Sequence, residues 1–412
     1  MGWLSTRRYR RSLFALLAGA VTVAAFAPFS YALGAVLGPL LLLILLHQAT
    51  PREAFYTGWA YGLGLLGFGV FWVHISIDQF GNLSTAVAIA LTLLFTLALA
   101  LFYGLVGLLT VYLGGRLKNS ANQLTRLLIF PALWVLAEWL RGWVLSGFPW
   151  LTLGYSQSDS PLAGYAPLLG VYGVSWLVLI TAALLALLAT VSIKSKAAAM
   201  AVIILLWAGG WQLSHIDWTQ PAGDPLKVSM IQGNIPQEIK WKRRQLVPTL
   251  ALYTRLTRSN WESDLIIWPE TAVPSFAHLV DEELLQPLRA EALENHSELL
   301  IGIPIWNEET RQYFNAMLLL GEERESYSKR HLVPFGEFMP LANLLLPVTR
   351  WLNIPMSSFS PGEDIPPILN VAGYPVGISI CYEDAFGVET IEALPQAAFL
   401  INSSNDAWFG DS

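Results

Sequence analysis

Seven apolar stretches occupy most of the first 214 residues, and they constrain the fold more than any other feature of this sequence. Their approximate ranges are 12–27, 31–47, 54–75, 84–113, 126–144, 164–191 and 197–214. A helix of about 20 residues crosses the hydrocarbon core of a bilayer, so most of these stretches are long enough to span it. The first two are short, and residues 27–30 between them predict a tight hairpin. The sequence therefore predicts a polytopic α-helical membrane bundle.

Charge is distributed unevenly along the chain. Residues 1–214 contain 11 Lys and Arg and 4 Asp and Glu, whereas residues 215–412 contain 13 and 26. Only 13% of all residues are charged and 54% are hydrophobic, which is too little charge for a wholly water-soluble chain. We therefore expect the first half in lipid and the acidic second half in water. The basic residues adjoin apolar stretches and form no stripe with aromatic residues, which argues against nucleic-acid binding.

Lysine and arginine also predict the orientation of the bundle, because they concentrate in cytoplasmic loops. If every stretch spans, the opposite loops contain only Arg141, and seven crossings place the domain that starts near His215 on the outer side. The residues on the basic side are Arg7, Arg8, Arg10, Arg11, Arg52, Arg116, Lys118, Arg126, Lys194 and Lys196. In a rival interpretation, residues 7–27 are a cleaved signal peptide, which would leave the placement of the later spans unchanged.

From residue 224 onward the pattern changes to short β-rich runs. We expect buried strands at 227–232, 264–268, 299–305, 313–320, 376–381 and 398–402. Amphipathic helices are expected at 242–262 and 281–296. Strands that alternate with helices predict a layered α/β domain. The predicted organisation is thus a membrane domain at 1–215, a linker at 216–226 and a second domain at 227–412.

Three reactive side chains stand at the ends of strands expected in this second domain. Glu270 follows Pro269, which cannot donate a ladder hydrogen bond and should end its strand. Lys329 stands in the segment Ser328-Lys329-Arg330-His331, and Cys381 ends the strand at 376–381. These residue types suit covalent catalysis, since a carboxylate can remove the thiol proton. An ammonium can stabilise the developing oxyanion and lower the thiol pKa.

Each of these residues also has a plainer interpretation. A lone cysteine on a buried strand is more often an inert part of the core. A glutamate after a strand is usually solvated, and a lysine beside Arg330 and His331 is usually on the surface. Cys381 is the only cysteine, which excludes a disulfide within the chain and a multi-cysteine metal site. The six histidines show no metal-ligand spacing, so we expect a mechanism without a metal or other cofactor.

Three ordered motifs resemble the catalytic motifs of the nitrilase superfamily. They are Trp268-Pro269-Glu270, Lys329-x-His331-Leu332-Val333-Pro334-Phe335-Gly336-Glu337 and Cys381-Tyr382-Glu383. The long motif around Lys329, preceded by seven apolar stretches, resembles the apolipoprotein N-acyltransferase family, and the resemblance covers nearly the whole chain. It implies an αββα sandwich in which Cys381 is the nucleophile, Glu270 the general base and Lys329 the oxyanion stabiliser. Further positions important in that family are matched by Trp241, Glu337, Tyr382 and Glu383.

The resemblance also implies substrates and a location. An acyl chain would pass from a phospholipid, expected to be phosphatidylethanolamine, to the N-terminal amine of a diacylated apolipoprotein cysteine, on the periplasmic side of the bacterial inner membrane. Drawing a whole acyl chain out of lipid would cost on the order of 10 kcal/mol, so a catalytic domain above an apolar bundle is favourable. Members of the family continue past the position of Ser412, so we expect the catalytic domain to be C-terminally incomplete.

One aromatic cluster in the membrane half has two interpretations. Trp139, Trp143, Phe148 and Trp150 gather around Arg141 in the long loop expected on the outer side. Such rings commonly form an interfacial belt. Alternatively, Arg141 and the rings, Trp150 among them, receive a phospholipid headgroup beside the catalytic mouth.

Two other functions compete with acyl transfer. A membrane-tethered amidase would use the same triad with water as acyl acceptor, but a small soluble amide would not require seven spans. A transporter or receptor with an inactive outer domain would need buried charges in the spans to form a substrate path. Glu138 and Asp78 lie near span ends, so no such path is evident.

Overall fold

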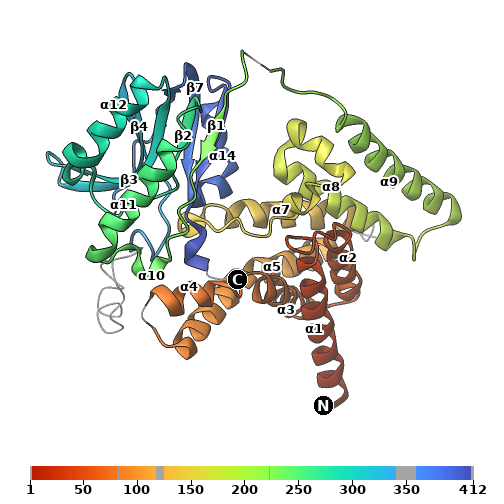
Figure 1. Cartoon of the computed structure of the whole chain (residues 1–412). Helices are drawn as coiled ribbons and strands as arrows, with labels where there is room; N and C mark the ends of the chain where they lie inside the picture. Colours follow the sequence, from red (N-terminus) through yellow and green to blue (C-terminus); the bar gives the residue numbers. More distant parts are fainter. Residues whose placement is uncertain (1, 82, 117–124, 222, 340–358, 410–412) are drawn as a thin grey trace. The chain divides into compact units, whose positions relative to one another are not determined.

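The chain folds into two compact units, as the computed structural model shows for residues 2–81, 83–116, 125–221, 223–339 and 359–409 (Figure 1). The first unit comprises Met1–His74 and Thr85–Gln220, and the second comprises Ile75–Ser84 and Pro221–Ser412. The second unit therefore starts inside the predicted linker and also takes in Ile75–Ser84, the segment that joins two of the predicted spans. Lys118 of the predicted basic loops lies outside the described residues, as do the side chains of Arg7, Arg8, Arg116 and Arg126.

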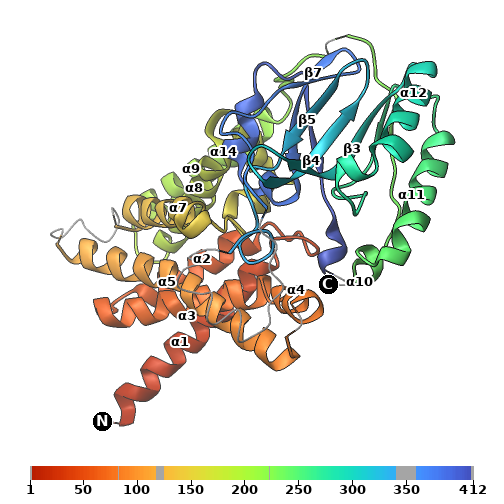
Figure 2. The same ribbon diagram turned by 90° about the vertical axis from the view of Figure 1, so that its left-hand side faces the viewer.

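Helices account for nearly all regular structure before residue 214 (Figure 2). The α-helices are α1 (Gly2–Val23), α2 (Gly34–Leu46), α3 (Pro51–Gly69), α4 (Val73–Phe80), α5 (Thr85–Arg116), α7 (Phe130–Arg141), α8 (Ala166–Leu187) and α9 (Ile193–Leu213). A short π-helix is η1 (Thr125–Ile129), and short 3-10 helices are η2 (Val144–Ser146), η3 (Leu153–Gln157) and η4 (Pro161–Tyr165). A capping box starts α3, because the Thr50 side chain accepts from the Glu53 N–H and the Glu53 carboxylate accepts from the Thr50 N–H.

Among the described helices, three are long and apolar enough to cross a membrane, namely α5, α8 together with η4, and α9. The pair α3 and α4, bent by 53°, adds a fourth if it forms one span. The other predicted stretches form α2 and α7, of 13 and 12 residues, and α1, which carries four arginines. A 13-residue helix is only about 20 Å long, shorter than a bilayer core of about 30 Å. Seven crossings therefore stay a prediction.

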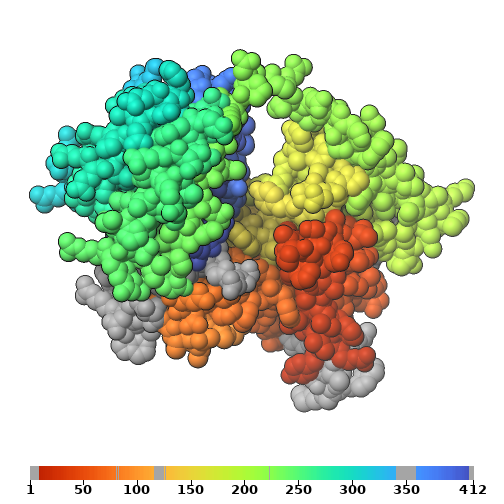
Figure 3. Space-filling view, viewed as in Figure 1, coloured from red at the N-terminus to blue at the C-terminus, as the bar shows by residue number. Residues whose placement is uncertain are grey.

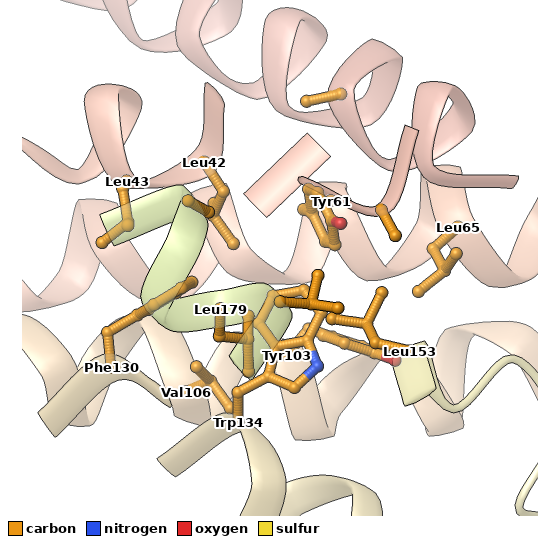
Figure 4. Packing of buried hydrophobic residues seen from close by; sticks show 14 of the residues in the cluster. Leu42, Leu43, Tyr61, Leu65, Tyr103, Val106, Phe130, Trp134, Leu153 and Leu179 are labelled. Atoms are coloured by element: carbon orange, nitrogen blue, oxygen red, sulfur yellow. The ribbon is translucent and has the colours of Figure 1, made fainter. Parts of the chain in front are cut away.

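Glycines let the helices of the first unit approach one another closely. A Cβ on Gly64 of α3 would lie 1.9 Å from the main-chain oxygen of Leu16 in α1, and one on Gly58 would lie 2.1 Å from that of Tyr103 in α5. In lipid there is no hydrophobic driving force between apolar helices, and small residues where two helices cross allow the close packing that holds them together. Figure 4 shows the core beside these crossings, where the rings of Tyr61 and Tyr103 lie 5.4 Å and 5.0 Å from that of Trp134.

Two β-sheets form the centre of the second unit. The first has the order β1 (Val228–Met230), β2 (Leu265–Ile267), β3 (Glu298–Asn307), β4 (Gln312–Leu320) and β5 (Arg324–Ser328). The second has the order β6 (Leu369–Val371), β7 (Tyr374–Ile380) and β8 (Phe399–Ser403), with β7 and β8 parallel. All six predicted strands are confirmed. Two further strands were not predicted, namely β5, a mostly polar run, and β6, which has three residues.

Side chains of the first sheet alternate between two cores. Ile266 and Leu299 pack on one face in a core with helices α11 (Arg243–Arg258) and α12 (Gln286–Glu294), whereas Leu265 and Leu300 pack on the other face against the second sheet. Figure 3 shows α11 and α12 as a green-to-teal surface over the strands. On the far side of the second sheet lie the short helices α14 (Gly387–Thr390) and η8 (Ile391–Ala393). The layer order is therefore that of the expected αββα sandwich.

Candidate active site

The three candidate catalytic residues follow three strands of the second unit. Glu270 comes after β2 and Lys329 directly after β5, both in the first sheet, whereas Cys381 directly follows β7 of the second sheet. The Lys329 N–H donates to the Asn315 main-chain oxygen at 2.8 Å, which prolongs the pairing of β4 and β5 to Lys329. The two facing sheets thus place the carboxylate, the amine and the thiol in one region, where the charges of Glu270 and Lys329 both act on the pKa of Cys381.

A buried ionic cluster surrounds the Lys329 ammonium. Its Nζ lies 2.9 Å from Glu337 Oε2 and 3.5 Å from Glu270 Oε1, and the lysine side chain is only 1% exposed. Burial lowers the pKa of Lys329, but the negative charges around it, those of Glu270 and Glu337 foremost, raise the pKa by more than burial lowers it. The net pKa therefore lies above its ordinary value. Lys329 is therefore a fixed cation at neutral pH, and the surface interpretation of this lysine is wrong.

Asn315 on β4 is a site residue that none of the motifs revealed. Its Nδ2 donates to Glu270 Oε1 at 2.7 Å and to Glu337 Oε1 at 2.9 Å, and the residue is 2% exposed. The remaining oxygen of Glu337 accepts from the Val333 N–H, and that of Glu270 accepts from the Asn405 N–H. Both carboxylates are thereby fixed in orientation. The available signal in the sequence was an asparagine inside an otherwise apolar strand.

Cys381 occupies a sharp turn between β7 and the short helix η7 (Cys381–Ala385), and its φ of 52° is the left-handed region that most residues avoid. Glu383 holds this turn. Its carboxylate accepts from the main-chain N–H of Ile380 at 2.7 Å, and also from those of Arg330 at 2.7 Å and His331 at 3.0 Å. Glu383 therefore ties the turn at Cys381 to the segment that follows Lys329.

The pKa of the Cys381 thiol is raised to about 11. Burial is the largest cause, and the negative charge of Glu270 adds to it, while the Lys329 ammonium lowers the pKa by less. The sequence predicts that the ammonium lowers the thiol pKa; Lys329 does act in that direction, but the net shift of the pKa is upward. Cys381 is consequently a neutral thiol at pH 7, and it needs a base to become a nucleophile.

The remaining predicted residues lie in both units. Trp241 follows the short helix α10 (Gln237–Lys240) and is 52% exposed, and the ring of Tyr382 lies edge-on to that of His331 with centroids 5.8 Å apart. In the first unit, Arg141 at the end of α7 donates from Nη1 to the main-chain oxygens of Phe148 and Trp150. Its Nη2 is buried with no hydrogen-bond partner among the described residues.

Comparisons with known proteins identify relatives of both halves. Two family models match, the apolipoprotein N-acyltransferase N-terminal domain over residues 18–184 and carbon-nitrogen hydrolase over residues 227–412. Curated apolipoprotein N-acyltransferases of Methylococcus capsulatus and Coxiella burnetii are 45% and 40% identical over 97% of this chain, which spans 79% and 81% of their lengths. A carbon-nitrogen hydrolase superfamily structure from Xanthomonas campestris is 20% identical over 44% of this chain and 64% of its own, with a TM-score of 0.31.

Proposed function

The chain belongs to the apolipoprotein N-acyltransferase family, and on that premise we propose that it transfers a phospholipid acyl chain, through Cys381, to the N-terminal amine of a lipoprotein. The observation that carries the assignment of roles is the buried cluster of Glu270, Lys329 and Glu337, which interacts electrostatically with the Cys381 thiol. Apolar helices before residue 214 are suited to hold a lipid donor in the bilayer.

In the first half-reaction Glu270 accepts the proton of the Cys381 thiol, a step that the raised thiol pKa makes necessary. The sulfur attacks the carbonyl carbon of the phospholipid ester, and the carbonyl oxygen becomes an oxyanion that the Lys329 ammonium stabilises. The ester C–O bond then breaks. The departing lyso-phospholipid oxygen takes the proton from Glu270, and the acyl group remains on Cys381 as a thioester.

In the second half-reaction the N-terminal amine of the lipoprotein attacks the thioester carbonyl. Glu270, again a carboxylate, accepts a proton from the attacking nitrogen, and Lys329 stabilises the second oxyanion. The C–S bond breaks, the product leaves as an amide, and the sulfur regains its proton from Glu270. The enzyme returns to its starting state without a metal or cofactor in any step.

Five other residues support this chemistry in the proposal. Glu337 and Asn315 fix the Lys329 ammonium and the Glu270 carboxylate, and Glu383 fixes the backbone at Cys381. Rigid placement of this kind lowers the entropic cost of reaching the transition state. The exposed ring of Trp241, and Tyr382, which follows Cys381 in the chain, are proposed to contact the substrates.

We further propose that phosphatidylethanolamine is the acyl donor and that Arg141 and Trp150 receive its headgroup. The buried Nη2 of Arg141 has a hydrogen-bonding capacity that no described residue uses, and a phosphate oxygen would suit it. The guanidinium is anchored by two main-chain oxygens of the loop that carries Trp150, so its direction is fixed.

The catalytic unit is proposed to face the periplasm from the inner membrane, because lysine and arginine are concentrated on the other side of the apolar stretches. In a Cys381→Ser background, the variant Glu308→Cys, in an exposed turn, should react with a membrane-impermeant maleimide in intact spheroplasts. The matched variant Ser195→Cys, in an exposed segment predicted to be cytoplasmic, should react only after lysis. The opposite pattern would reverse the proposed orientation.

The acyl-enzyme itself tests the proposed reaction. Full-length protein incubated with phosphatidylethanolamine vesicles should gain the mass of one acyl group at Cys381, and a matched phosphatidylglycerol sample tests the donor. A diacylated peptide with a free N-terminal cysteine should discharge the thioester, whereas its N-acetylated form should not, because it has no free amine. Double-reciprocal plots should be parallel when both substrates are varied. Equal discharge in the absence of any peptide would instead indicate a hydrolase that uses water.

A further inference from the structure

A second buried lysine lies against the candidate base, outside all three catalytic motifs. Lys240 ends α10 and is only 5% exposed. Its Nζ lies 3.0 Å from Thr271 Oγ1 and 3.4 Å from the main-chain oxygen of Glu270. An ammonium is rarely buried to this degree without a charge to compensate, so its position requires an explanation.

The charges of the site supply that explanation. Within the described residues, Lys329 is the cation in ion-pair contact with both Glu270 and Glu337. One positive charge is therefore paired with two negative charges. Lys240 interacts electrostatically with Glu270 and brings the charge of the four groups to zero. In a buried site of low dielectric constant an uncompensated charge is costly, so a second cation beside the two carboxylates stabilises the buried cluster.

The backbone beside the base gives a second, geometric reason. Thr271 has a φ of 44°, a left-handed conformation that a threonine seldom adopts and that surrounding contacts must hold. Lys240 contacts both residues of this Glu270–Thr271 turn. The other end of α10 reaches the same carboxylate, because Gln237 Oε1 accepts from Asn405 Nδ2 and the Asn405 N–H donates to Glu270 Oε2.

We propose that Lys240 is a positioning residue for acyl transfer, whose ammonium holds the Glu270–Thr271 turn and balances the second carboxylate of the buried site. This proposal rests on the proposed function, since it assigns Lys240 a role through Glu270 as the base. Lys240 itself exchanges no proton with substrate.

The ionisation of Lys240 makes the proposal measurable. Burial lowers its pKa to about 8, and the charge of Glu270 opposes this shift only in part. Thr271, whose hydroxyl Lys240 contacts, is uncharged. A lysine with a lowered pKa is charged below that pKa and neutral above it, so its contribution is largest well below pH 8 and is lost as the pH rises through about 8.

The test is the rate of thioester formation on the full-length enzyme, followed by intact mass between about pH 6 and pH 10 in the absence of acceptor. The wild-type rate should fall above about pH 8. Lys240→Arg keeps its charge and should move this fall out of the measured range. Lys240→Met should be slower by roughly 10-fold at pH 7 and should lose the fall altogether. The exposed neighbour provides a matched control, Lys242→Met, which should behave as wild type.

Unchanged rates and an unchanged pH profile in Lys240→Met would overturn the proposal. If that variant fails to fold, Lys240→Arg decides, because a fall that remains near pH 8 with a permanent cation in place cannot come from Lys240. A wild-type enzyme that forms no thioester would contradict the proposed function instead. The role of Lys240 would then be measured from the pH dependence of Cys381 alkylation by iodoacetamide, in which the same variants should differ in the same order.

Discussion

Replacing Cys381 with alanine is expected to abolish both formation of the acyl-enzyme and transfer to the lipoprotein acceptor. In the proposed mechanism the acyl chain is bonded to this sulfur between the two half-reactions, and Cys381 is the only cysteine in the chain. Removal of a covalent nucleophile costs about 10⁴-fold or more. Intact mass after incubation with phospholipid should show no added acyl group, and a gel-shift assay with diacylated peptide should show no product.

The fold should survive this substitution. Cys381 is partly exposed and its side chain is small, so alanine leaves little cavity, and the thermal midpoint should change by only a few degrees. Cys381→Ser offers a matched control of nearly equal size, in which the less acidic hydroxyl should give a very slow acylation. A Cys381→Ala protein that still transfers acyl groups would show that the site works by direct transfer without a covalent intermediate.

The strands that carry the site were predictable because their core faces are apolar. The runs at 264–268 and 376–381 placed Glu270 and Cys381 at strand ends, and β2 and β7 confirm this. In contrast, β5 precedes Lys329 as a mostly polar run, so only the motif after it indicated the lysine. Its pairing with β4 is a tertiary contact, and no local periodicity encodes such a contact.

The sequence did not reveal the residues that act through long-range hydrogen bonds. Asn315 lies 45 positions from Glu270 and Lys240 lies 30 positions from it, and both approach it only because the sheets and α10 converge there. The direction of the net pKa shift of Cys381 could likewise not be predicted from the sequence, since it depends on whether burial raises the pKa by more than the Lys329 charge lowers it. The number of membrane crossings stays a prediction for another reason. Apolar composition indicates where a stretch lies, but the length of the helix that forms there decides whether it can cross the bilayer, as the 13-residue helix α2 shows.

Replacing Lys329 with methionine is expected to slow acylation by about 10²- to 10³-fold, the usual effect of losing one oxyanion donor. The same change leaves Glu270 and Glu337 without the cation between them, so it also threatens the fold. The double variant Lys329→Met/Glu337→Gln separates these effects. It removes one negative charge together with the positive one, and it should recover thermal stability without recovering the rate.

A matched control is Lys227→Met, which removes a lysine from an exposed ion pair with Glu262 and should change neither property appreciably. Thioester formation at saturating phospholipid gives the rate, and thermal unfolding gives the stability. Recovery of both in the double variant would mean that Lys329 serves only to neutralise the buried carboxylates. Recovery of stability alone would place the ammonium at the developing oxyanion, because the substituted methionine fills much the same space with no charge to offer the transition state.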